Sequence, residues 1–126
     1  MSYEIQKLDD HVEIRLSGEI SHWDVLLIFG RLRLMTPRKE LSDVWVLSDD
    51  CAVPQFASFP TMVQYSTKLM PRDMVLNRSA IVVSNHLQKA QAEMYRREAS
   101  GLPYEIGVFS DRENAVAWVR EKNKPS

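Results

Sequence analysis

The sequence predicts an α/β domain built on a five-stranded, mostly parallel sheet, with elements in the order β-β-α-β-α-β-α-β-α. Three observations lead to this prediction: a strictly alternating strand near the N-terminus, short apolar runs without alternation, and helical segments between successive strands. Strands that alternate with single helices favour parallel pairing through right-handed crossovers. The length of 126 residues fits one domain over 1–126.

A hairpin supplies the first two strands, over residues 3–8 and 11–20, and the Asp9-Asp10 pair between them favours a turn. In the second strand apolar and polar residues alternate, which is typical of one buried face and one face in water. The polar face is therefore expected to need no cover other than solvent. The apolar set is Val12, Ile14 and Leu16, and the polar set is Glu13, Arg15 and Ser17.

Two later strands, over 44–47 and 79–84, are apolar without alternation, so both of their faces are expected to be buried. The last strand is expected over 104–109. These three strands, together with the hairpin, complete the five.

Four helices are expected, one after each strand from the second onward. The first begins with Ser21 as its N-cap and ends near Met35, because the residue before Pro37 disfavours the helical conformation. On the last helix, Trp118 is expected to be a core residue. The other helices are expected over 58–70, over 85–101 and after Asp111.

Composition and charge exclude several classes of function. A formal net charge of −1 argues against a nucleic-acid binder, which needs a basic face to displace counterions. No apolar stretch approaches the roughly 20 residues that span a bilayer. The single cysteine, Cys51, allows no disulfide within the chain, and the N-terminus lacks the pattern of a signal peptide. We therefore expect a cytoplasmic protein.

Three stretches, at 12–21, 79–95 and 104–119, resemble the STAS/SpoIIAA-like superfamily, in particular its uncharacterised branch grouped with lipid-binding SEC14-type domains. In that branch the last stretch commonly has a strand ending in phenylalanine, an acidic cap, and a helix with alanine and tryptophan. The resemblance implies a superhelix of βα units. The matching residues here are Phe109, Asp111, Ala115, Ala117 and Trp118.

The resemblance also raises the question of a phosphorylation switch. Anti-sigma-factor antagonists of the STAS type carry a phosphorylatable serine after the third strand, in an Asp-Ser-Ser-Gly or similar motif. Here the corresponding segment reads Leu47-Ser48-Asp49-Asp50, without glycine. Because two carboxylates would repel a phosphate on Ser48, this chain is expected to lack the switch.

The strongest candidate site lies where the central strands end, since open α/β sheets bind ligands at the carboxyl edge. An acidic pair, Asp49 and Asp50, could hold a cation or simply solvate a loop. His86 could form an acid/base pair with Asp49 or simply start a helix. A methionine- and aromatic-rich segment could line an apolar pocket or fill the core. The expected pocket residues are Ser48, Asp49, Asp50, Phe56, Phe59, Met62, Asn85 and His86.

Two functions follow from these observations, and neither is enzymatic. No nucleophile–base pair, metal set or cofactor motif can be assembled, so no catalytic, metal or cofactor residue is expected. The first function is a binding module for a lipid-like or other small hydrophobic ligand. The alternative is a protein–protein interaction or regulatory module that acts as a homodimer.

The homodimer is expected from the winding of the chain. Crossovers of one hand should keep the helices on one side of the sheet, which leaves an apolar face on the other. A patch containing Trp45 would then need cover, either from the first helix or from a second subunit related by a twofold axis.

Overall fold

The computed structural model describes residues 2–35, 42–52, 78–101 and 105–122, together with Pro60 and Gln64. The helix expected over 58–70 therefore lies outside the described residues, except for Pro60 and Gln64, which are both helical. The strands are β1 (Ser2–Lys7), β2 (His11–Ser17), β3 (Ser42–Leu47), β4 (Arg78–Val82) and β5 (Glu105–Phe109), and the helices are α1 (His22–Met35), α3 (His86–Glu98) and α4 (Arg112–Lys122).

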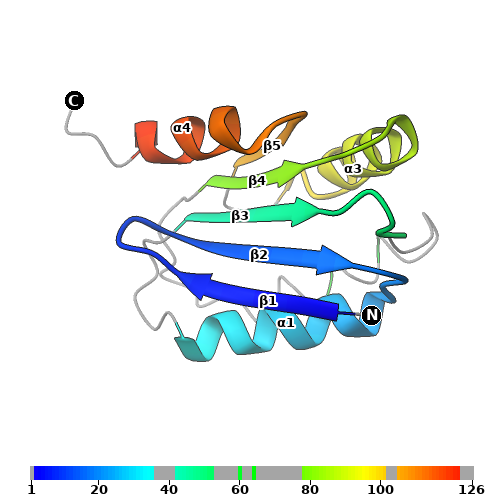
Figure 1. The fold of residues 1–126 in the computed structure, drawn as a ribbon, viewed down its shortest axis with the longest axis horizontal. Coiled ribbons are helices and arrows are strands. Elements are labelled where there is room, and N and C mark those ends of the chain that lie inside the picture. The colour runs from blue at the N-terminus through cyan, green and yellow to red at the C-terminus, as the bar shows by residue number, and fades with distance from the viewer. Residues whose placement is uncertain are drawn as a thin grey trace.

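The five strands form one sheet in the order β1-β2-β3-β4-β5 (Figure 1). β1 pairs antiparallel with β2, and the three remaining pairings are parallel. The expected α/β class and the mostly parallel five-stranded sheet are thus confirmed.

Helices α1 and α3 pack on one face of the sheet. From α1, Val25 and Ile28 join Ile14 of β2 and Trp45 of β3 in one buried cluster, to which α3 contributes Ala92. Both helices follow a strand and lead to the next parallel strand. Right-handed crossovers that advance in one direction along the sheet place such helices on the same face.

Helix α4 covers the opposite face, and the expectation that the helices keep to one side is wrong for it. Its Ala115, Val116 and Val119 pack on Val44 of β3 and Ala80 of β4. Because α4 follows the last strand and leads to no other strand of the sheet, the crossover rule does not fix its side. Packing on both faces explains why β3 and β4 are apolar without alternation.

The face of the sheet that contains Trp45 is covered within the chain. Trp45 is buried against α1, where its ring meets that of Phe29 edge-on with 5.5 Å between centroids. Of the two covers considered for this face, the first helix supplies it, so Trp45 gives no reason for a second subunit.

Local signals explain most of the boundaries. The Ser21 hydroxyl caps α1 by accepting from the Asp24 amide at 3.2 Å, and the Asp24 carboxylate accepts from the Ser21 amide at 2.9 Å. Asp111 accepts from the Asn114 amide at 2.8 Å and caps α4 as expected. β2 ends earlier than expected, at Ser17, because Gly18 takes a φ of 76°, a left-handed conformation that favours glycine.

Candidate functional site

The carboxyl ends of β3 and β4 are joined by hydrogen bonds, and two of the expected site segments meet there. The Ser84 hydroxyl donates to the Leu47 carbonyl at 2.7 Å, and the Asn85 side-chain amide donates to the Asp49 carbonyl at 3.3 Å. Asn85 also caps α3 by accepting from the Gln88 amide at 2.9 Å. The structure therefore brings together Ser48–Asp50 and Asn85, as the sequence predicted.

Gln88, which the sequence analysis did not single out, organises this edge. Its side chain is 2% exposed, and its amide nitrogen donates to the carbonyls of Ser48 and Cys51, both at 2.8 Å. Its side-chain oxygen accepts from the Ser84 amide at 2.8 Å. One buried glutamine thus fastens the loop after β3 to the start of α3, and a buried polar group with three partners is a strong local constraint.

The possible acid/base pair of Asp49 and His86 does not form among the described residues at this edge. Asp49 and His86 are both exposed, and no hydrogen bond or ion pair joins them. Asp50 accepts from the Ser48 hydroxyl, and this bond lowers the pKa of its carboxyl. Across the described part of the chain, no group of three or more metal-ligating side chains is assembled. The apolar half of the predicted pocket, Phe56, Phe59 and Met62, lies outside the described residues.

Cys51 is buried beside this edge. Burial is the first cause, and the neighbouring Asp50 carboxylate the second, of a rise in the pKa of its thiol to about 11. A thiol with such a pKa carries almost no thiolate at neutral pH and is a poor nucleophile.

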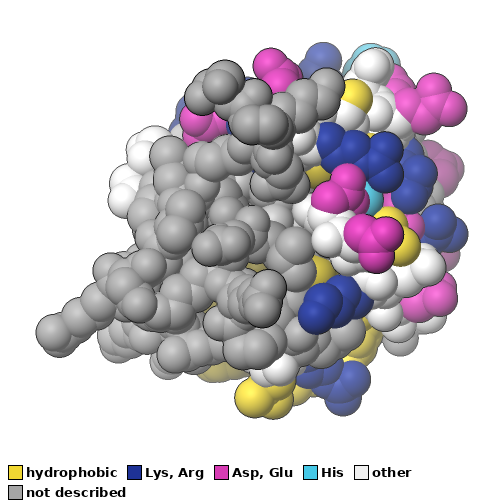
Figure 2. Space-filling view, turned by 90° about the vertical axis from the view of Figure 1, so that its left-hand side faces the viewer, with side chains coloured by type: hydrophobic (Ala, Val, Ile, Leu, Met, Phe, Trp, Pro, Cys, Tyr) yellow, Lys and Arg dark blue, Asp and Glu magenta, His cyan; other side chains and the backbone are white. Residues whose placement is uncertain are grey.

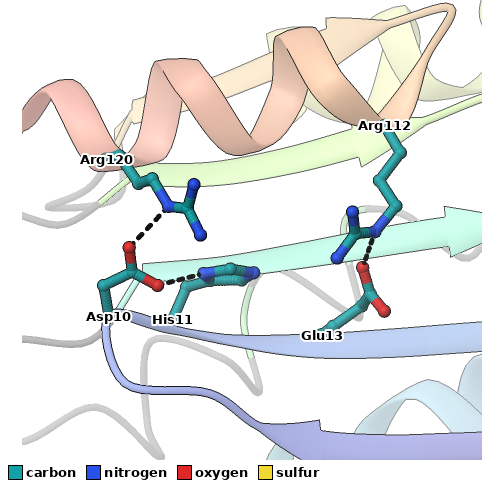
Figure 3. A network of polar contacts seen from close by, with 5 residues as sticks. All are labelled: Asp10, His11, Glu13, Arg112 and Arg120. Carbon is teal, nitrogen blue, oxygen red and sulfur yellow. Dashed lines mark hydrogen bonds and ion pairs between the residues drawn. The ribbon is translucent and has the colours of Figure 1, made fainter.

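A second polar cluster links the N-terminal part of β2 to α4 (Figure 3). His11 Nδ1 lies 2.7 Å from an oxygen of Asp10, and the other oxygen of Asp10 accepts from Arg120 at 2.6 Å. Glu13 of β2 pairs with Arg112, which lies on α4 like Arg120, and with its strand neighbour Arg15 at 3.0 Å. The two α4 arginines reach down from the helix to the hairpin, so these ion pairs attach α4 to β2 and to the turn before it.

This cluster corrects the expected polar face of β2. Glu13 was expected to lie in water but is 1% exposed, and the Arg112 side chain reaches it from α4. His11 is the first residue of β2, where the second strand was expected to begin, and is fully buried. Its Nε2 atom has no hydrogen-bond partner within the described residues, and its imidazole is shielded from solvent.

The carboxylates of the cluster are held in their charged forms. For Glu13, burial raises the pKa, but hydrogen bonds from Arg112 and Arg15 outweigh it and leave the pKa below its ordinary value. For Asp10, burial is likewise outweighed by the hydrogen bonds from His11 and Arg120, which lower its pKa. Both groups therefore stabilise the fold at neutral pH, and this contribution is lost as the pH falls through their folded-state pKa values.

Asp43 of β3 is the opposite case. It accepts hydrogen bonds from the Ser79 hydroxyl and, at 2.9 Å, from the Trp45 ring nitrogen. Burial away from any described cation outweighs these bonds and raises the pKa of its carboxyl from 3.8 to about 6.

Asp43→Asn should therefore change how stability depends on pH. The folded wild type binds a proton on Asp43 more tightly than the unfolded chain does. The stabilisation of the folded state by the protonated Asp43 is therefore greatest below pH 4 and is lost as the pH rises through about 6. Asparagine cannot ionise and can still accept both hydrogen bonds. Urea unfolding at pH 4.5 and 7.5 should show the variant gaining about 2 kcal/mol on the wild type over that interval. A difference that does not change with pH would contradict the raised pKa.

The outer face of α1 carries the third notable feature, a row of exposed apolar side chains. Trp23, Leu27 and Leu34 are 61%, 52% and 84% exposed, respectively. Their spacing places them on one side of the helix, with Gly30 between Leu27 and Leu34, while Ile28 and Leu32 on the other side are buried. We call Trp23, Leu27 and Leu34 the outer row.

Comparison with known proteins supports the fold. An uncharacterized protein from the DUF3478 family, from Shewanella loihica, is solved with a SpoIIAA-like fold and superposes on this chain with a TM-score of 0.62. The superposition covers 94% of this chain and 92% of that protein, at 15% sequence identity. This chain has a SpoIIAA-like fold. No protein-family model and no curated protein matches the sequence.

The SpoIIAA-like sheet positions Ser48 directly after β3, which is where the resemblance places the phosphorylatable serine. In this chain the Ser48 hydroxyl donates to Asp50 beside the exposed Asp49. A phosphate there would meet two carboxylates instead of hydrogen-bond donors.

Incubation of the purified chain with a serine kinase of the anti-sigma type should therefore leave Ser48 unmodified. Intact-mass spectrometry should show no mass increase of one phosphate, with a STAS-type substrate of the same kinase as the positive control. Stoichiometric phosphate on Ser48 would show that the acidic loop does not block the reaction.

Positive and negative side chains are mixed on the surface of the SpoIIAA-like chain. On the face drawn in Figure 2, Lys and Arg side chains lie among Asp and Glu side chains over the described residues, so neither sign of charge dominates there. Within the described ranges, no helix combines the length and apolar character needed to cross a membrane.

Proposed function

We propose that this SpoIIAA-like chain is a non-enzymatic protein-interaction module that acts as a homodimer through the outer row of α1. The observation that carries the proposal is the exposure of Trp23, Leu27 and Leu34 on one side of one helix. Large aromatic and aliphatic side chains that gather on an exposed surface mark interaction sites more often than single exposed apolar residues do.

The construction of α1 supports this function. The inner side of the helix is committed to the core through Val25, Ile28 and Leu32. Ser21 and Asp24 cap its start, so the helix is a well-defined element that presents its outer row on a fixed scaffold. A rigid helix loses little conformational entropy when it binds, which favours its use in an interface.

The carboxyl edge of the sheet gives less support to the other candidate, a pocket for a lipid-like ligand as in SEC14-type domains. Several of its described polar groups, chiefly the Gln88 side chain, are engaged in hydrogen bonds within the chain. The ligand-binding hypothesis rests on Phe56, Phe59 and Met62, and it stays a prediction from the sequence.

The homodimer is tested by comparing two aspartate substitutions at exposed leucines. Leu27→Asp introduces a charge into the outer row, and Leu87→Asp introduces the same charge on α3, where the leucine is 67% exposed. Sedimentation equilibrium at tens of micromolar should show a dimer for the wild type and for Leu87→Asp and a monomer for Leu27→Asp. Circular dichroism of all three proteins checks that they are folded.

Native mass spectrometry of the wild type separates the two candidate functions. A dimer without additional mass supports the interaction module. A monomer that carries a co-purified small molecule would overturn the proposal in favour of the ligand-binding function, and a wild-type monomer without ligand would overturn it as well.

A further inference from the structure

We infer that two copies of the chain pair through antiparallel α1 helices, with the twofold axis at the middle of the outer row. This inference rests on the proposed function and specifies the geometry of the partner, a second copy of the same helix. It follows from three properties of α1: the spacing of the outer row, the position of Gly30, and the charges that flank the row.

The spacing of the row is that of a helix–helix seam. Trp23, Leu27, Gly30 and Leu34 succeed one another at intervals of four, three and four residues. Such intervals keep the residues on one stripe of a helix and are the intervals by which paired helices contact each other. The row extends over most of the length of α1, so a partner helix of equal length can cover it.

The row is also self-complementary when it is reversed. In an antiparallel pair centred between Leu27 and Gly30, Trp23 lies opposite Leu34 of the second copy, and Leu27 lies opposite Gly30. Trp23, the largest side chain of the row, thus contacts Leu34 of the second copy, and Leu27 contacts a glycine, which leaves room for it. A methyl group added at Gly30 would meet no atom within 4 Å, so the surface there is open to receive Leu27 of the second copy.

The flanking charges favour the same arrangement. Asp24 follows Trp23 by one position, and Arg31 follows Gly30, which lies in line with the outer row, so both border the row on the same side. In an antiparallel pair equal sides face each other, so Asp24 of one copy lies beside Arg31 of the other, twice by symmetry. Arg31 is exposed, and its guanidinium lies 5.4 Å from the centre of the Tyr3 ring.

A parallel pair is disfavoured by the same features. It would place Trp23 against Trp23 and Leu34 against Leu34, leaving Gly30 against Gly30 as a gap. It would also align the two helix dipoles, whereas an antiparallel pair sets each N-terminus beside the C-terminus of the other helix. The capped start of α1 with its Asp24 carboxylate would then lie near the partner's last turn.

Cysteine cross-linking distinguishes the two arrangements. Trp23→Cys and Leu34→Cys are prepared separately, mixed and oxidised, and the products are separated by mass. The native Cys51 is buried, with its pKa raised to about 11, and does not compete. An antiparallel pair should give the mixed disulfide between the two variants in at least tenfold excess over the Leu34→Cys self-disulfide.

The possible outcomes separate this inference from the proposed function. Leu87→Cys on α3, mixed with Leu34→Cys, is the control for random collision and should give only the background yield. A self-disulfide of Leu34→Cys as the main product would overturn the antiparallel geometry while leaving a dimer through α1. Background yields from all mixtures, with the wild type a dimer in sedimentation, would place the interface elsewhere; a monomeric wild type would overturn both proposals.

Discussion

Replacing Gln88 by leucine should lower the free energy of unfolding by about 3–5 kcal/mol, as measured by urea denaturation at neutral pH. Leucine has a similar volume, so little of the loss comes from a cavity. The loss comes from polar groups that remain behind. The Cys51 carbonyl loses its side-chain donor, the Ser48 carbonyl keeps only the Cys51 amide, and the Ser84 amide loses its acceptor. Each buried polar group without a partner costs about 1–3 kcal/mol.

Two comparisons make this prediction specific. His86→Ala, on the exposed side of the same helix, should change stability by less than about 0.5 kcal/mol. Gln88→Glu keeps the acceptor for the Ser84 amide but presents an oxygen to both carbonyls, so it should be more destabilising at pH 7 than near pH 4, where the carboxyl can donate. A Gln88→Leu variant as stable as the wild type would mean that water replaces the glutamine at this edge.

Trp118→Ala should be the second most damaging of these substitutions, with a loss of about 2–4 kcal/mol in the same assay. Trp118 was expected in the core, and it is half-buried against the apolar residues that α4 packs on β3 and β4. Its ring packs on Phe109 with 5.4 Å between centroids, and Arg78 lies 4.8 Å above it. The estimate is below that for a fully buried tryptophan because part of the ring is in solvent. Ala117→Ser, on an exposed position of α4, is the matched control and should change stability by less than about 0.5 kcal/mol.

Gly107 on β5 provides an independent check of this packing. A methyl group at Gly107 would lie 3.1 Å from two atoms of the Trp118 ring and 2.8 Å from the Phe109 ring. Gly107→Ala should therefore cost about 1–2 kcal/mol in the wild type. In the Trp118→Ala background the cost should fall to half or less, because one of the two rings is gone. Equal costs in both backgrounds would show that the tryptophan ring does not rest on Gly107.

The elements of the fold could be predicted from the sequence because their signals are local. Alternation in 11–17 and the unbroken apolar run at 44–47 each indicate a strand, and caps such as Ser21 mark helix starts. The position of α4 could not be predicted in this way. No crossover rule constrains the final helix, and its placement decides whether Glu13 lies in water or is buried.

The candidate site was predicted in part for a related reason. Position at the ends of neighbouring parallel strands was enough to bring Ser48–Asp50 and Asn85 together. The importance of Gln88 depends on which side of α3 faces the sheet and on how far its side chain reaches. A glutamine three residues after an asparagine cap is the signal of a capping pair, but nothing local indicates that its side chain turns to a different strand's loop.

The ion pairs between the hairpin and α4 have a consequence for how the chain is completed during its synthesis. Arg112 and Arg120 reach residues that are 99 and 110 positions earlier in the sequence. Until α4 has left the ribosome, Glu13 lacks its main cation, and the apolar face of β3 and β4 lacks its helix. Contacts of such long separation form late, since the loop they close must be ordered first. We therefore expect the emerging chain to pass through a stage with an incompletely neutralised carboxylate on β2 and an open apolar surface on β3 and β4, until α4 emerges and covers both.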